Sequence, residues 1–123
     1  MLGIGIDLVD IDRFRKVLAR TPGMTERLFT VGEAAYAELA EDPTARLAAR
    51  FAAKEATLKS LGLGLGGMRM SEMEVVQHAD GHPELVLHGD AVAVARDRGV
   101  ARWLITLSHT HAVAQATVVA LGP

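Results

Sequence analysis

One long helix is predicted through the middle of the chain, from Asp42-Pro43 to about Leu61. An aspartate followed by a proline is a common opening for a helix, and Gly62 is a typical stop. At 100° per residue, large apolar side chains fall on one stripe and alanines cover the neighbouring face. The stripe, which we expect to face the core, contains Leu47, Phe51, Leu58 and Leu61, and the alanine face contains Ala48, Ala49, Ala52 and Ala56. Small side chains there favour the close approach of a ligand or a second subunit.

Shorter elements are predicted on either side of this helix. Residues 2–9 have the apolar run of a buried strand, and residues 10–20 have the pattern of an amphipathic helix. The spacing Thr30-x-x-Glu33 fits a capping box that opens a helix to about residue 41. Further strands are predicted at 73–78, 84–88, 102–108 and 112–120, with a short helix at 90–98. We therefore predict a single α+β domain, residues 1–123, in which an antiparallel β-sheet packs on a long central helix.

Composition excludes several classes of function. A net charge of −2, with only three Phe, one Tyr and one Trp, argues against a nucleic-acid-binding surface. The absence of cysteine excludes disulfides, thiolate nucleophiles and sulfur-ligated metals. The first residues have neither a basic segment nor a long apolar run, so we expect no signal peptide, no membrane span and a cytoplasmic location. A core this small makes an oligomer a reasonable expectation.

Two carboxylates stand out as candidate metal ligands. Asp7 ends a run of Gly and Ile, where a carboxylate is costly unless it is paired or bound to a cation. Asp10 is better placed to cap the next helix, which leaves Asp7 without an obvious structural role. Glu55 lies on the long helix, and two hard oxygen ligands suit Mg²⁺. The spacing leaves open whether Asp7 and Glu55 meet in space.

The basic residues of the long helix allow two interpretations. Glu55 and Lys59 form an i,i+4 pair, and such pairs are commonly solvated and contribute a few tenths of a kcal/mol. The alternative is a carboxylate that holds a metal beside an ammonium that meets phosphate. Lys54 falls among the leucines of the apolar stripe. We expect its stem to lie along that face while its ammonium reaches water.

Two further groups of polar residues are candidates for contacts with a ligand or partner. Arg13, Lys16 and Arg20 recur at i, i+3 and i+7, which places them on one face of the helix predicted at 10–20. Such a face is usually only solvated, but it also suits an acidic helix of a partner. His109 follows Ser108 at a strand end, where a contact with phosphate or carboxylate is plausible, whereas His111 fits a polar turn.

Three segments resemble the holo-acyl-carrier-protein synthase family, the small phosphopantetheinyl transferases. They are GIGIDLVDIDRF at 3–14, RFAAKEATLKSLG at 50–62 and SHTHAVAQATVV at 108–119. The resemblance implies an α+β fold of the phosphopantetheinyl transferase type that assembles as a homotrimer. It also implies that coenzyme A lies in clefts between subunits, and that Mg²⁺ assists transfer of 4′-phosphopantetheine to a serine of an acyl carrier protein.

The resemblance also implies roles for individual residues. Asp7 and Glu55 match the family's metal ligands, and Lys59 matches the lysine near the pyrophosphate, where it would stabilise the leaving group. The base that takes the serine proton would be Glu55 or a metal-bound water. The remaining matches are Arg50 and His109 near the 3′-phosphate of coenzyme A, Gly62 against the phosphates, Gly81-His82-Pro83 near the adenine, and Arg13 toward the carrier protein. Thr110 stands where some relatives carry an acidic residue.

Two other functions fit the same residues. A magnesium-dependent hydrolase of coenzyme A or another pyrophosphate would use the same Asp, Glu and Lys set. A non-catalytic trimer that binds partners through its basic helix would need none of them. The sequence leaves open whether the carrier protein belongs to fatty-acid or polyketide synthesis.

Overall fold

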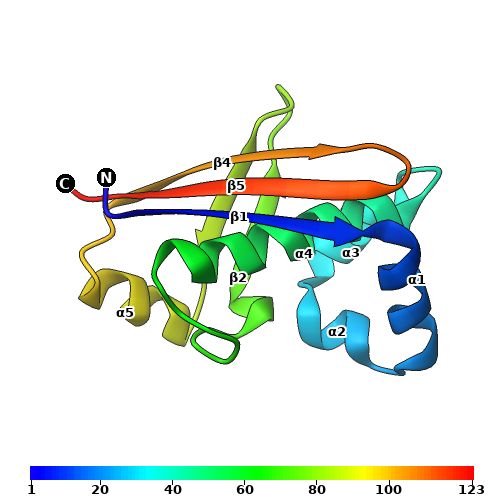
Figure 1. Ribbon diagram of the computed structural model, residues 1–123, viewed down its shortest axis with the longest axis horizontal. Helices are drawn as coiled ribbons and strands as arrows, with labels where there is room; N and C mark the ends of the chain where they lie inside the picture. Colours follow the sequence, from blue (N-terminus) through cyan, green and yellow to red (C-terminus); the bar gives the residue numbers. More distant parts are fainter.

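A three-stranded antiparallel sheet lies on one long helix, α4 (Pro43–Ser60), in the computed structural model, which describes the whole chain from residue 1 to 123 (Figure 1). Its strands are β1 (Gly3–Asp10), β5 (Val113–Leu121) and β4 (Arg102–His109), in the order β1-β5-β4. The predicted α+β architecture, an antiparallel sheet on a long central helix, is confirmed.

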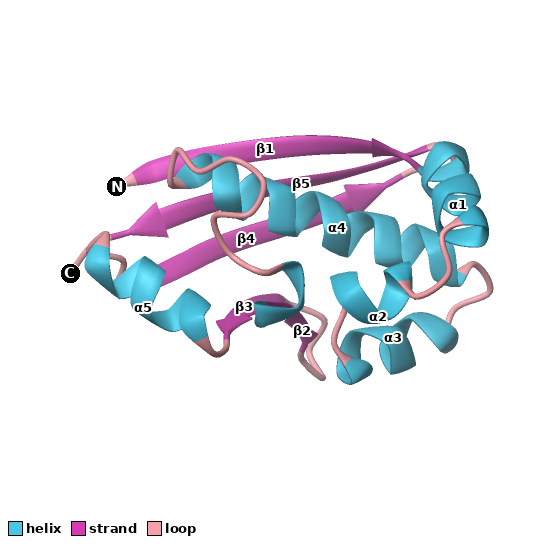
Figure 2. Ribbon diagram, turned by 90° about the horizontal axis from the view of Figure 1, so that it is seen from below, coloured by secondary structure: helices cyan, strands magenta, loops and turns pink.

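The other elements are arranged along α4 (Figure 2). Helices α1 (Ile11–Arg20), α2 (Met24–Leu28) and α3 (Val31–Glu38) gather near the N-terminal end of α4. A second antiparallel sheet pairs β2 (Met73–Gln77) with β3 (Pro83–Leu87), between the short 3-10 helix η1 (Met70–Glu72) and helix α5 (Asp90–Asp97). The sequence patterns did not predict α2 or η1. None of the helices is both long and apolar enough to span a membrane.

Local sequence signals account for most of the helix starts. The side chain of Asp10 accepts a hydrogen bond from the backbone N–H of Arg13 and caps α1, as predicted. Thr30 and Glu33 form the complete capping box of α3. Pro43 opens α4, but the Asp42 side chain makes no capping bond; it accepts hydrogen bonds from Arg15 instead.

Most of the alanine face of α4 is packed against the main sheet, and only Ala49 lines a cavity. Ala48, Ala52 and Ala56 are fully buried, whereas Phe51 of the predicted core stripe is only half-buried. A Cβ atom at Gly5 would lie 2.0 Å from the carbonyl oxygen of Ala56, so only glycine lets β1 approach the helix this closely. The prediction that the alanines admit a ligand or second subunit is therefore wrong for Ala48, Ala52 and Ala56, which pack against a strand of the same chain, whereas Ala49 borders a cavity.

Lys54 does not reach solvent, which corrects the prediction made from its position on the helix. Its ammonium is fully buried and lies 2.7 Å from a carboxylate oxygen of Glu33, which is also fully buried. The ammonium donates two more hydrogen bonds, to the carbonyl oxygens of Leu28 and Met70. The three acceptors satisfy all three of its protons. This ion pair therefore joins α4 to the ends of α2 and η1 and to α3.

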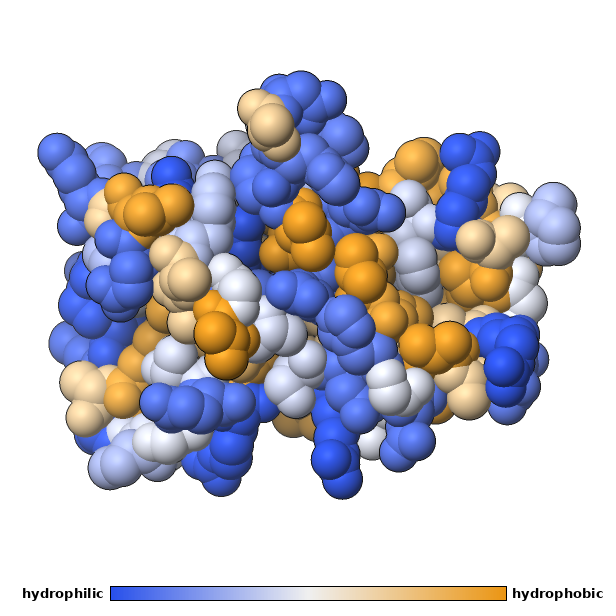
Figure 3. Space-filling view, turned by 180° about the vertical axis from the view of Figure 1, so that it is seen from behind, coloured by the Kyte–Doolittle hydropathy of each residue, from blue (hydrophilic) through white to orange (hydrophobic).

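The face of the main sheet that points away from α4 carries exposed apolar side chains. Along β5, alternate residues from Ala114 to Ala120 are buried against the helix. The outward side chains of β1 and β4 include Ile4, Ile6, Leu8 and Leu104, each about half exposed or more. The surface view shows hydrophobic patches on the body of the molecule and a mostly hydrophilic projecting tip, which is the β2–β3 hairpin (Figure 3).

Candidate functional site

Asp7 and Lys59 meet across the contact between β1 and α4. The ammonium nitrogen of Lys59 lies 2.8 Å from Oδ1 of Asp7 and 3.1 Å from the carbonyl oxygen of Ile6. The Asp7 side chain is 18% exposed and that of Lys59 is 53% exposed, so the pair sits at the protein surface. Gly3 lies against Ser60 and Gly5 against Ala56, so the first half of β1 packs on the last turns of the helix and Asp7 comes beside Lys59.

Asp7 and Glu55 line the same cavity, which has a volume of about 500 Å³. Burial raises the pKa of the Glu55 carboxyl above its ordinary value, the negative charge of Asp7 raises it further, and Lys59 opposes the shift. The ion pair of Lys59 is with Asp7 and not with Glu55, so the solvated i,i+4 pair is not formed. Most of the cavity wall is apolar and includes Phe14, Phe51 and Met70.

The two carboxylates fit a divalent cation. The structure contains no cluster of three or more His, Asp or Glu side chains able to hold a metal, so Asp7 and Glu55 would be its only acidic protein ligands. Mg²⁺ is commonly held by one or two carboxylates, with water and phosphate oxygens completing its shell. Burial and the neighbouring charge of Asp7 both disfavour the ionised form of Glu55, and a bound cation would offset both effects.

Helix α1 presents three unpaired basic side chains beside this cavity. Arg13 lines the cavity, and Arg13, Lys16 and Arg20 are exposed and form no ion pair. Arg15, on the same helix, is held by Asp42 through hydrogen bonds of 3.0 and 3.1 Å. These bonds lower the pKa of the Asp42 carboxyl. The free positive charge of α1 is therefore confined to the face that the sequence predicted.

A second cavity, of about 290 Å³, contains Arg50, Pro83 and His109. Arg50 is only 3% exposed, and its Nε atom has no hydrogen-bond partner. Burial lowers the pKa of its guanidinium, the charge of Glu33 opposes the shift, and the nearby Arg46 adds to it. No carboxylate lines this cavity, so its polar groups suit an anion.

Sequence reasoning gave no role to five residues of the second cavity: Tyr36, Arg46, Gln77, Thr106 and Leu107. The i,i+4 spacing of Arg46 and Arg50 was visible in the sequence and would have placed both arginines on one side of α4. No pattern in the sequence around Tyr36 indicated that it lines a binding cavity.

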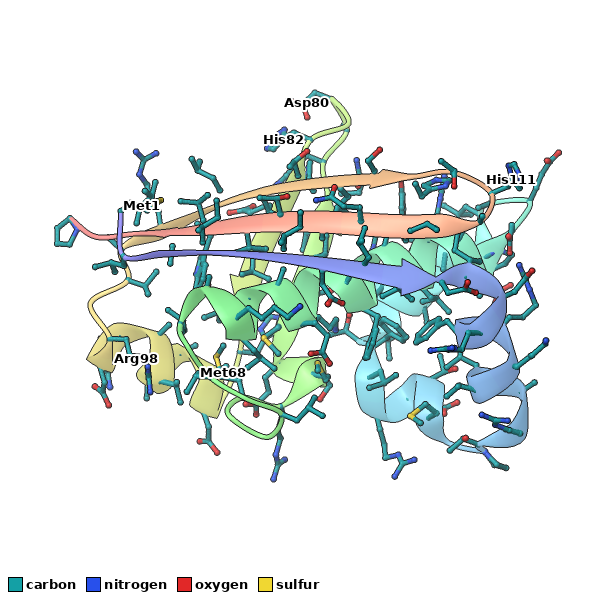
Figure 4. All side chains as sticks on the ribbon, in the orientation of Figure 1. Met1, Met68, Asp80, His82, Arg98 and His111 are labelled. Atoms are coloured by element: carbon teal, nitrogen blue, oxygen red, sulfur yellow. The ribbon has the colours of Figure 1, made fainter.

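One chain does not bring the predicted site residues together. Arg50 and Glu55 are five residues apart on α4, so their side chains project about 140° apart around the helix axis and face different cavities. Gly62 lines a third hollow with Leu2 and Arg98. His111, which the sequence assigned to a polar turn, is exposed in the turn between β4 and β5 (Figure 4).

Comparison with known proteins identifies the family. Residues 3–116 match the family model described as the 4′-phosphopantetheinyl transferase superfamily. The chain is 48% identical, over 98% of its length and 95% of the other chain, to a holo-[acyl-carrier-protein] synthase of Syntrophotalea carbinolica. The structure also resembles a holo-[acyl-carrier-protein] synthase of Neisseria meningitidis, with a TM-score of 0.89 and 28% identity over 98% of each chain.

A further structural neighbour was solved with a ligand. It is the holo-[acyl-carrier-protein] synthase of Helicobacter pylori in complex with coenzyme A, with a TM-score of 0.84 and 26% identity over 96% of this chain and 99% of that one. The chain therefore belongs to the 4′-phosphopantetheinyl transferase superfamily and, within it, to the holo-[acyl-carrier-protein] synthases.

Proposed function

We propose that this protein transfers the 4′-phosphopantetheine group of coenzyme A to a serine of an apo-acyl carrier protein, with adenosine 3′,5′-bisphosphate as the second product. The observation that carries the proposal is the pair of carboxylates, Asp7 and Glu55, on one cavity beside the Lys59 ammonium, in a chain of this family. The coenzyme A complex of the Helicobacter pylori relative supports the choice of donor substrate.

Asp7 and Glu55 are the residues that would hold Mg²⁺ beside the pyrophosphate of coenzyme A. When bound, the cation neutralises phosphate charge and polarises the reacting phosphorus as a Lewis acid. Lys59 is already held by Asp7, at 2.8 Å, so its positive charge is positioned before substrate arrives. Positioned charge of this kind is the main contribution that a protein makes to phosphoryl transfer.

The reaction moves one proton and one phosphoryl group. The serine oxygen of the carrier protein forms a bond to the β-phosphorus, and the bond from that phosphorus to adenosine 3′,5′-bisphosphate breaks. The serine proton goes to the Glu55 carboxylate, which lines the cavity that the serine would enter. Lys59 stabilises the negative charge that develops on the leaving bisphosphate.

The basic face of α1 is the proposed docking surface for the carrier protein. Arg13, Lys16 and Arg20 have no acidic partner within the chain, and Arg13 borders the cavity that holds Asp7 and Glu55. An acidic helix lying on this face would bring its own serine toward that cavity.

We also propose that the protein works as a homotrimer, because a single chain places the carboxylate cavity and the arginine cavity apart from each other. We propose a cytoplasmic location for it. Coenzyme A carries a pyrophosphate on the 5′ position of its ribose and a phosphate monoester on the 3′ position. The carboxylate cavity suits the first, and the cavity of Arg50 and His109 suits the second. A neighbouring copy packed on the exposed apolar face of Ile4, Ile6 and Leu104 would complete the cleft.

Intact-mass measurement of an apo-acyl carrier protein tests the proposal directly. Incubation with this protein, coenzyme A and Mg²⁺ is expected to add one phosphopantetheine group, and EDTA is expected to prevent the addition. Release of adenosine 3′,5′-bisphosphate without any carrier protein would instead identify a hydrolase. Binding of coenzyme A without turnover would identify a non-catalytic module.

A further inference from the structure

Arg46 and Arg50 are held side by side against one aromatic ring in the second cavity. The guanidinium carbon of Arg46 lies 4.0 Å from the ring centroid of Tyr36, and that of Arg50 lies 4.5 Å from it. Nη1 of Arg46 also donates a hydrogen bond of 2.8 Å to the carbonyl oxygen of Tyr36. The ring and the carbonyl therefore orient both guanidinium groups before any ligand binds.

The two arginines carry positive charge that nothing in the cavity neutralises. No Asp or Glu is among the lining residues. Glu33 is the nearest acidic influence on Arg50, but its carboxylate is already engaged by Lys54 at 2.7 Å. Arg50 is 3% exposed, and its Nε has no hydrogen-bond partner, so it is a buried donor that remains unsatisfied. A buried, unpaired cation of this kind is costly unless an anion completes the site.

Phosphate is the anion that this geometry favours. Guanidinium groups bind phosphate through paired N–H donors. The two positive charges of Arg46 and Arg50 in one cavity balance the negative charge of a phosphate monoester. Coenzyme A has one phosphate monoester, on the ribose 3′ position, and that group is absent from 3′-dephospho-coenzyme A. Ser108 and His109 line the same cavity and are exposed to a ligand there.

We propose that Arg46, oriented by Tyr36, is a second guanidinium for the 3′-phosphate and sets the preference of the enzyme for coenzyme A over 3′-dephospho-coenzyme A. This inference rests on the proposed function, because it assigns a part of the same substrate to a residue that the family motifs did not mark. Arg46 contributes selectivity, while the transferred group reacts in the other cavity.

Steady-state kinetics with both donors test the assignment. Arg46→Gln is expected to lower kcat/KM for coenzyme A about tenfold, the cost of one charged hydrogen bond, with a much smaller change for 3′-dephospho-coenzyme A. Tyr36→Leu should also lower the ratio of kcat/KM for coenzyme A to kcat/KM for 3′-dephospho-coenzyme A. Arg46→Lys should keep part of the preference for coenzyme A because it retains the charge. Arg96→Gln is the matched control, since that arginine is exposed on α5 away from both cavities.

Equal losses for both donors in Arg46→Gln, or no loss for either, would overturn the assignment. Binding measurements separate it from the proposed function. Adenosine 3′,5′-bisphosphate should bind the unmodified protein more tightly than AMP does, and Arg46→Gln should remove most of that difference. If the unmodified protein binds the bisphosphate selectively but transfers nothing to any carrier protein, the proposed function fails and the assignment of Arg46 stands.

Discussion

The ammonium of Lys54 and the carboxylate of Glu33 lie 2.7 Å apart with no exposure to solvent on either side chain. Glu33 also accepts hydrogen bonds from the backbone N–H groups of Thr30 and Val75, and Lys54 donates to the carbonyl oxygens of Leu28 and Met70. Leu28 and Met70 both line the cavity of Asp7 and Glu55. The pair thus fixes part of the wall beside the carboxylates.

Lys54→Met is expected to lower the free energy of unfolding by about 3 to 5 kcal/mol, because it leaves the Glu33 carboxylate buried without a partner. Urea denaturation measures the loss. The double variant Glu33→Gln/Lys54→Met should be less destabilised than Lys54→Met alone, since no buried charge remains. Lys16→Met, at an exposed position, is the control and should change the free energy of unfolding very little. An equally small change for Lys54→Met would contradict the stabilising role of the Lys54–Glu33 pair.

Lys59→Ala is expected to lower kcat about a hundredfold while changing the affinity for coenzyme A much less. The reason is that its charge acts most strongly on the leaving group as the bond breaks. Single-turnover rates and calorimetric binding of coenzyme A separate the two quantities. Lys59→Arg, which keeps the charge, should retain more activity than Lys59→Ala. Equal losses in turnover and affinity would count against a role in the transition state.

Arg13→Glu is expected to raise KM for the carrier protein about tenfold, because it reverses one charge of the docking face on α1. The KM for coenzyme A should stay close to that of the unmodified protein. Added salt should weaken carrier binding to the unmodified protein, since the contact is electrostatic. Arg96→Glu makes the same charge change on α5 and serves as the control. Kinetics that do not depend on salt would refute the docking face.

Glu74 gives a pH-dependent contribution to stability. Burial raises the pKa of its carboxyl, but hydrogen bonds from His88 and Thr30 outweigh burial and leave the pKa below its ordinary value. The distances are 2.8 Å to Nε2 of His88 and 2.8 Å to Oγ1 of Thr30. A carboxyl with a lowered pKa stabilises the fold above its unfolded pKa and loses that contribution as pH falls through its folded pKa.

Glu74→Gln should therefore destabilise the protein at neutral pH by roughly 1 kcal/mol, less than a buried hydrogen bond to a charged group contributes, because the His88 partner is half-exposed. The difference from the unmodified protein should shrink as pH falls below about 4. Thermal unfolding at several pH values measures the difference, with Glu41→Gln, at an exposed carboxylate that forms no ion pair, as the control. A difference that does not change with pH would mean that the Glu74 charge is not involved.

The local patterns of the sequence determined much of the fold. The capping box at Thr30 and Glu33, the cap at Asp10 and the Pro43 start of α4 depend on residues within one turn of each other, so they could be predicted without the rest of the chain. The strands from Arg102 to Leu121 likewise follow from their own composition. Helix α2 was missed because five residues carry too little periodicity to mark a helix.

Only the tertiary structure decided which residues of different segments meet. Helical periodicity gives the direction of each side chain around the axis of α4, but it does not say what packs on each side. The glycines of β1 bring the sheet onto the alanines, which places Asp7 beside Lys59, while the ends of α2 and η1 enclose Lys54. Tyr36 joins Arg46 and Arg50 for the same reason, because packing between distant segments, unlike local backbone preference, depends on the whole chain.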